Sequence, residues 1–149
     1  MRRFEVCPDG GSERRFAIVF RPGDDILNGL TGFAENEHLG ASQFTAIGGV
    51  SEAVLGWFDE EKKMYREVAI TRQAEVLSLV GDVARLGDKP VVHAHMTVAF
   101  EDGSTRGGHL LSAVVSPTLE VMLVESPHAL RKEHDDDAGI DFIVPDDSP

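Results

Sequence analysis

Residues 91–110 read VVHAHMTVAFEDGSTRGGHL, and polar and apolar side chains alternate over the first half of this stretch. Side chains two positions apart on a β-strand point to the same face of the sheet. One face of a strand over Val91–Phe100 is therefore entirely apolar, and the other face carries His93 and His95. The stretch predicts a half-buried strand that is followed by a hairpin turn and a return strand containing His109.

The turn between these strands decides where His109 points. A three-residue loop over Glu101–Gly103, with its glycine in the left-handed conformation, places His109 opposite His95. Opposed side chains have β-carbons about 5 Å apart, so the imidazole of His93 would also lie within reach. A two-residue Asp102-Gly103 turn shifts the register by one residue and sends His109 to the apolar face. We predict the three-residue loop, because the other register places a histidine among apolar side chains.

Three histidines around one open position form the arrangement of a catalytic zinc site, in which water fills the fourth place. The predicted hairpin therefore favours a divalent metal, in particular zinc, at His93, His95 and His109. The alternative is that these histidines are hydrogen-bonded polar residues of a sheet with no ligand.

Glu75 is the acidic residue that we consider for a role beside the metal. It opens the predicted strand Glu75–Gly81, in which Leu77 and Leu79 would share its face. A carboxylate near a metal acts as a general base, as an outer partner of the ligands or as a ligand itself. The alternative is an exposed residue at the first position of a strand. The histidines outside the hairpin are expected to be ordinary surface residues: His38, His128 and His134.

The chain length of 149 residues suits one domain with a substantial core and is short for two. No apolar stretch approaches the roughly 18 residues that a membrane helix needs, and the first residues do not resemble a secretory signal. Cys7 is the only cysteine, which excludes an internal disulfide and a cluster of thiolate ligands. These features lead us to expect a cytoplasmic protein without a membrane segment.

The chain is acidic, with a formal net charge of -12 from 14 basic and 26 acidic residues. DNA binding draws most of its affinity from phosphates that meet Lys and Arg, so this charge disfavours nonspecific DNA binding by the bare chain. Residues 131–149 are especially acidic and are expected to form a C-terminal tail. Within this tail the run Asp135–Asp137 is expected to lie in a solvated turn or a frayed end, and Ile140–Ile143 to return and pack.

One early helix is predicted among strands. Apolar residues at helical spacing over Ile26–Ala34 favour a helix from Asp25 to about Glu37, with Asp24 as its cap. Gly29 and Gly32 weaken this helix by up to about 1 kcal/mol each relative to alanine. The close approach of a strand or of a neighbouring subunit would explain their presence.

Strand-like segments precede and follow this helix, separated by short connections that include Gly48-Gly49 and Ser116-Pro117. The pattern predicts a single α+β domain, in which a large and mostly antiparallel sheet is partly covered by the helix. The predicted strands span residues 13–20, 44–47, 53–58, 65–70, 74–80, 91–100, 105–113 and 119–125.

Several short motifs follow one another in a fixed order along the chain. They are RPGD at 21–24, IGGV at 47–50, EVLSLVG at 75–81, HAH at 93–95, GGHL at 107–110 and TLEV at 118–121. In this combination the chain resembles the plants-and-prokaryotes conserved (PPC) domain in its single-domain prokaryotic form. The resemblance is strongest over residues 14–125, so a PPC-like domain is expected over 1–130 and the acidic tail over 131–149.

The resemblance implies a homotrimer and, as in some prokaryotic members, a metal site built from the matching histidines, often assigned as zinc. The family's DNA-binding label is tied to plant proteins, where an AT-hook segment precedes the domain. This chain has no Arg-Gly-Arg core and no basic arm, so direct DNA binding is not carried over.

Our prediction is a homotrimeric binding or regulatory module with a histidine metal site, associated with DNA through partners and able to take a small-molecule ligand. The alternatives are a small zinc enzyme of unknown substrate, in which Glu75 moves the proton, and a direct DNA-binding protein.

Overall fold

The computed structural model describes residues 1–5 and 13–144, so Cys7 and the last five residues of the predicted tail lie outside the described part. The described residues form one nine-stranded sheet and one helix. The bounds of the elements are β1 Arg2–Glu5, β2 Arg15–Phe20, α1 Ile26–Asn36, β3 Ser42–Asp59, β4 Met64–Ile70, β5 Ala74–Leu86, β6 Lys89–Ala99, β7 Thr105–Glu125, β8 Arg131–Asp135 and β9 Ile140–Val144.

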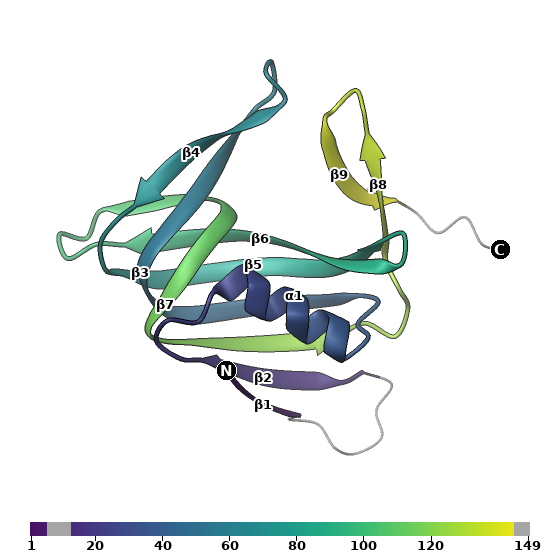
Figure 1. The fold of residues 1–149 in the computed structure, drawn as a ribbon, viewed down its shortest axis with the longest axis horizontal. Helices are drawn as coiled ribbons and strands as arrows, with labels where there is room; N and C mark the ends of the chain where they lie inside the picture. Colours follow the sequence, from purple (N-terminus) through teal and green to yellow (C-terminus); the bar gives the residue numbers. More distant parts are fainter. Residues whose placement is uncertain (6–12, 145–149) are drawn as a thin grey trace.

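Two long strands, β3 and β7, organise the sheet (Figure 1). Strand β3 pairs with β4, β5 and β7, while β6 joins β5 to β7, so β3, β5, β6 and β7 form a closed ring of antiparallel neighbours. Strands β2 and β1 continue the sheet beyond β7, and the β8–β9 hairpin meets β5 through one parallel contact, Arg85 with Arg131. The predicted α+β fold with a large, mostly antiparallel sheet is confirmed.

The two glycines of Gly48-Gly49 lie inside β3, and Ser116-Pro117 lies inside β7, so the prediction that both dipeptides connect separate strands was wrong. The two stretches face each other where the register between β3 and β7 shifts. A β-carbon on Gly49 would lie 2.4 Å from the carbonyl oxygen of Ser116, and one on Gly48 would lie 2.2 Å from that of Thr118. The glycines therefore allow two bent strands to pack backbone against backbone.

Replacing Gly48 with alanine is expected to destabilise the protein by about 1–3 kcal/mol, because the new methyl group meets backbone that has little room to move. The φ of +154° at Gly48 adds strain for any other residue. Gly32→Ala is the matched control: no atom lies within 4 Å of its β-carbon position, so this helix should gain up to about 1 kcal/mol. Urea unfolding measures both, and equal stabilities of the two variants would contradict this account.

Helix α1 buries its apolar stripe against the sheet, with Ile26, Leu30, Phe33 and Ala34 in the core. The predicted cap was wrong by one residue. The carboxylate of Asp25 accepts a hydrogen bond from the backbone N–H of Asn28 at 2.8 Å.

The carboxylate of Asp24 belongs instead to the turn before the helix. It accepts from the backbone N–H of Arg21 at 2.9 Å and pairs with the N-terminal amine at 2.9 Å. The close approach expected at the helix glycines occurs at Gly29, where a β-carbon would lie 2.3 Å from the ring of Phe20.

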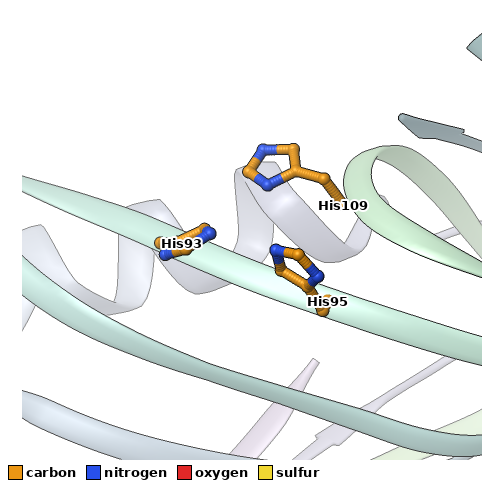
Figure 2. A group of neighbouring side chains, drawn as sticks. All are labelled: His93, His95 and His109. Atoms are coloured by element: carbon orange, nitrogen blue, oxygen red, sulfur yellow. The ribbon is translucent and has the colours of Figure 1, made fainter. Parts of the chain in front are cut away.

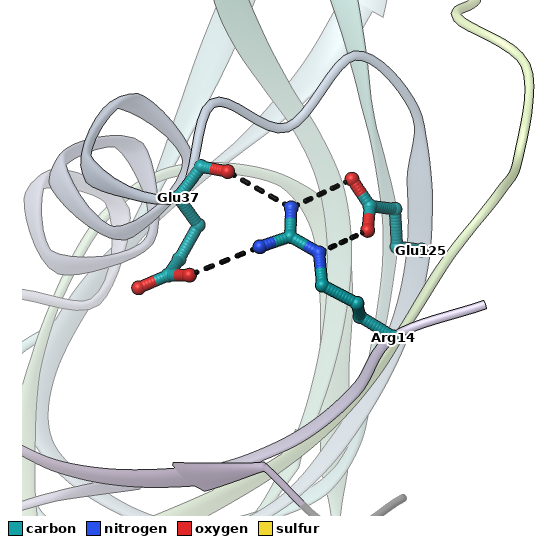
Figure 3. Close-up of polar contacts among 3 residues, drawn as sticks. All are labelled: Arg14, Glu37 and Glu125. Carbon is teal, nitrogen blue, oxygen red and sulfur yellow. Dashed lines mark hydrogen bonds and ion pairs between the residues drawn. The ribbon is translucent and has the colours of Figure 1, made fainter. Parts of the chain in front are cut away.

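Arg14 holds together three separate parts of the fold, as Figure 3 shows. Its guanidinium forms a two-pronged ion pair with Glu125 at the end of β7, with one contact at 2.9 Å. It also donates to the carbonyl oxygen of Glu37 at 2.9 Å and pairs with the Glu37 carboxylate at 3.2 Å, just beyond the end of α1. The residue before β2 thus joins the helix end to β7, in the bidentate geometry that makes arginine pairs strong.

The described part of the predicted acidic tail is a β-hairpin, β8–β9, with the run Asp135–Asp137 at its turn. Lys63, at the tip of the β3–β4 hairpin, donates to the backbone carbonyl of Asp136 at 2.6 Å. Two hairpins thus meet on one side of β6. No helix in residues 1–5 and 13–144 is long and apolar enough to cross a membrane.

Candidate metal centre

The hairpin between β6 and β7 has the predicted register. His95 pairs with His109, and the backbone N–H of Phe100 donates to the carbonyl of Ser104 at 2.9 Å. Gly103 has a φ of +78° and donates to the carbonyl of Phe100 at 2.9 Å. These bonds define a three-residue loop over residues 101–103, which confirms the predicted turn.

This register brings the three predicted ligands together. The ring centroids of His93, His95 and His109 lie 5.1–5.3 Å apart, and one nitrogen from each lies within 4.8 Å of the others. Figure 2 shows the rings of His93 and His95, from β6, turned toward that of His109, from β7. Three nitrogens at this spacing are able to contact one ion with small side-chain adjustments, since zinc–nitrogen bonds are about 2.0–2.1 Å long.

The environment of His95 and His109 favours the neutral form of imidazole, which is the form that binds metals. Burial, followed by the charges of His93, His95 and Lys132, lowers the pKa of His109 to about 4. Burial and the charge of His93 also lower the pKa of His95. The Nδ1 atom of His109 is buried and has no hydrogen-bond partner among the described residues. An unpaired polar atom is costly in such a place, and a cation would satisfy it.

Asp82 and Lys132 support the cluster from behind, and the sequence did not reveal either of them. A carboxylate oxygen of Asp82 lies 3.4 Å from Nδ1 of His93, and the other lies 2.7 Å from Nζ of Lys132. Burial tends to raise the pKa of Asp82, but contacts with His93 and Lys132 hold it below its ordinary value. A carboxylate behind a histidine ligand orients the ring and raises its basicity.

Tyr65 of β4 completes the surroundings of His109. Its ring stacks on the imidazole with centroids 4.5 Å apart and an interplanar angle of 20°. Burial raises the pKa of its phenol group. Tyr65 therefore presents a neutral aromatic surface beside the cluster.

Glu75 is not brought to the histidines. It pairs with Ala99, four residues along β6 from His95, which corresponds to about 13 Å along a strand. The register of β5 shifts between Val76 and Ser78, so Leu77 is 53% exposed whereas Leu79 is buried. The prediction that Leu77 and Leu79 share a face was wrong, because an irregularity in the strand breaks the alternation.

The other histidines lie as follows. His38 and His128 are exposed and outside the cluster, as predicted. His134 also lies at the surface, but it faces the histidine cluster across a cleft of about 340 Å³ and pairs through Nδ1 with Asp141 at 2.7 Å. The floor of this cleft is formed by His93 and His109, and the β8–β9 hairpin forms one wall.

The fold and the cluster define a class: a single-domain α+β protein with a three-histidine candidate metal centre beside an open cleft. The family model of the Plants and Prokaryotes Conserved (PCC) domain matches residues 8–127. The chain belongs to this family, the one that its motifs resemble.

Solved structures of several microbial proteins share the fold. A provisionally named DNA-binding protein from Ralstonia eutropha JMP134 is 30% identical, with a TM-score of 0.82 over 88% of this chain and 91% of that one. A metal-containing protein from Archaeoglobus fulgidus is 32% identical, with a TM-score of 0.81 over 88% and 93%. A plant- and prokaryote-conserved (PPC) protein from Pyrococcus horikoshii is 27% identical, with a TM-score of 0.79 over 84% and 87%.

Curated relatives include the bifunctional protein GlmU of Synechococcus sp. (strain JA-3-3Ab), which is 31% identical over 118 residues. The match covers 78% of this chain and 18% of that protein. The chain therefore corresponds to a small part of this longer relative.

Proposed function

We propose that this protein is a homotrimeric, metal-binding PPC-family module that holds one divalent ion, zinc, at His93, His95 and His109. The observation that carries the proposal is the convergence of three imidazoles, one of them with a buried nitrogen that has no partner among the described residues. Nitrogen ligands suit zinc, and three protein ligands leave one coordination position open. The Archaeoglobus fulgidus relative is named a metal-containing protein, which supports a metal site of some kind in this chain.

An apolar area on the sheet face opposite α1 supports the trimer. Ile47, Leu77, Val80 and Met122 are between 46% and 62% exposed, while each has at least one buried neighbour on its strand. Thr45 of β3 pairs with Val80 on one side and with Met122 on the other, so these side chains lie on adjacent strands. A closed cyclic assembly of copies would bury such an area.

In this proposal the module acts by binding or regulation, and any association with DNA is made through partners. The name of the Ralstonia eutropha relative motivates the link to DNA. The net charge of -12 opposes direct binding, because duplex DNA is itself strongly anionic. If the chain nevertheless binds duplex DNA at low salt, with an affinity that falls steeply as salt rises, this part of the proposal is wrong.

The metal and the trimer are tested on the intact chain purified without an affinity tag. Elemental analysis is expected to give close to one zinc ion per chain, and sedimentation equilibrium the mass of three chains. Absence of stoichiometric metal would refute the metal centre, and a monomeric mass would refute the trimer. The two measurements are independent, so each part of the proposal stands or falls alone.

A further inference from the structure

The cleft beside the histidine cluster is built from parts of the chain that are distant in sequence. His93 of β6 and His109 of β7 form its floor, Tyr65 of β4 forms one side, and His134 and Ile140 of the C-terminal hairpin form the other. The contact from Lys63 to Asp136 joins the tips of the two flanking hairpins. Two of the three candidate ligands, His93 and His109, thus line an open cleft that three other strands help to form.

The charges around this cleft leave an ion at the histidines without a counter-charge. Three neutral imidazoles do not reduce the two positive charges of a divalent ion. The carboxylate of Asp82 is already matched by Lys132 at 2.7 Å, and that of Asp141 lies 2.7 Å from His134. Even with Asp141 counted in full, the filled site keeps an excess of positive charge, which an anion would neutralise.

The size and the lining of the cleft indicate the rest of the ligand. A volume of about 340 Å³ is in the range of sites for small organic molecules. Val91, Val92 and Ile140 supply apolar walls, and Tyr65 adds an aromatic surface. An inorganic anion would leave most of this surface without a partner, whereas an organic body would cover it.

We propose that this cleft binds a small organic carboxylate with an aromatic or branched aliphatic body, whose carboxylate takes the open coordination position of the metal. The proposal rests on the metal centre proposed above. The body of the ligand packs between Tyr65 and Ile140, and the C-terminal hairpin is the element that selects it by shape.

Benzoate serves as the probe, with benzylamine as a cation and benzyl alcohol as a neutral molecule of similar shape. Isothermal titration of the zinc-loaded protein is expected to show binding of benzoate and no binding of the other two probes. The metal-free protein should not bind benzoate. In cobalt-substituted protein, benzoate should change the visible absorption spectrum, because a new oxygen ligand alters the coordination of the metal.

Two tryptophan variants on β9 locate the site. Ile140→Trp fills the cleft and should weaken benzoate binding by about tenfold or more, with zinc content unchanged. Ile143→Trp is the matched control, because Ile143 is 42% exposed and does not line the cleft. Its affinity should equal that of the original chain.

The outcomes separate this proposal from the one on which it rests. Stoichiometric zinc without benzoate binding overturns the ligand and leaves the metal centre standing. Equal binding of benzoate with and without zinc, or equal effects of the two tryptophan variants, also overturns it. Failure to hold zinc at all overturns both proposals.

Discussion

Replacement of His109 with alanine is expected to lower the zinc affinity of the protein by more than about 100-fold, because loss of a group that only orients a ligand already costs about 10–100-fold. His109 is the proposed ligand on the second strand of the hairpin, so its removal leaves two imidazoles on one strand. Competition with a chromophoric zinc chelator measures the affinity.

The matched control is His128→Ala, since His128 is exposed and lies outside the cluster. This variant should bind zinc as the original chain does. His95→Ala provides a second ligand variant at an exposed position, where loss of packing is small, and it should lose zinc to a similar extent. Retention of full affinity by both ligand variants would rule out the three-histidine site.

The hairpin and its cluster were predictable because their determinants are local. Alternation over Val91–Phe100 assigns both strand histidines to one face, and the loop chemistry at Gly103 fixes the partner of His95. Turn type and strand period both act over a few residues, and the sequence displays them directly. The early helix was predictable for the same reason, apart from the choice between two adjacent aspartates as its cap.

The groups behind the cluster were not predictable, because long-range pairing positions them. Asp82 reaches His93 only because β5 continues past Gly81 to Leu86, beyond the end predicted for it. Lys132 reaches Asp82 from the segment that composition assigned to an acidic tail. A longer β5 paired with β6 would have set Asp82 opposite His93, and this is the one signal that the sequence offered.

The glycine and proline pairs misled for a related reason. Gly48-Gly49 and Ser116-Pro117 resemble turn signals when each is read alone. In the folded chain they face each other, and each allows the other strand to bend without leaving the sheet. Glu75 was misplaced because its partner on β6 is Ala99, four residues from His95, and the pairing of β5 with β6 cannot be seen in the sequence.

Replacement of Lys132 with methionine is expected to destabilise the metal-free protein by about 1–3 kcal/mol, the cost of leaving a partly buried polar group without its partner. The Lys132 side chain is 4% exposed, and its amine lies 2.7 Å from the carboxylate of Asp82. Methionine conserves most of the apolar stem, so the loss reports mainly the uncompensated charge of Asp82. Urea unfolding of metal-free samples measures it.

The neighbouring Arg131 offers a matched control for this prediction. Its ion pair with Glu133, at 3.1 Å, is between side chains that are 58% and 57% exposed, so Arg131→Met should cost at most about 1 kcal/mol. Adding Asp82→Asn to Lys132→Met should recover part of the lost stability, because a neutral amide needs no counter-charge. If the two methionine variants lose the same stability, or if the second substitution recovers none, the ion pair does not anchor the C-terminal hairpin beneath the histidines. If instead the difference is found, the hairpin that walls the cleft is held by the same carboxylate that orients His93, and loss of zinc and loosening of the hairpin should accompany each other in Asp82 variants.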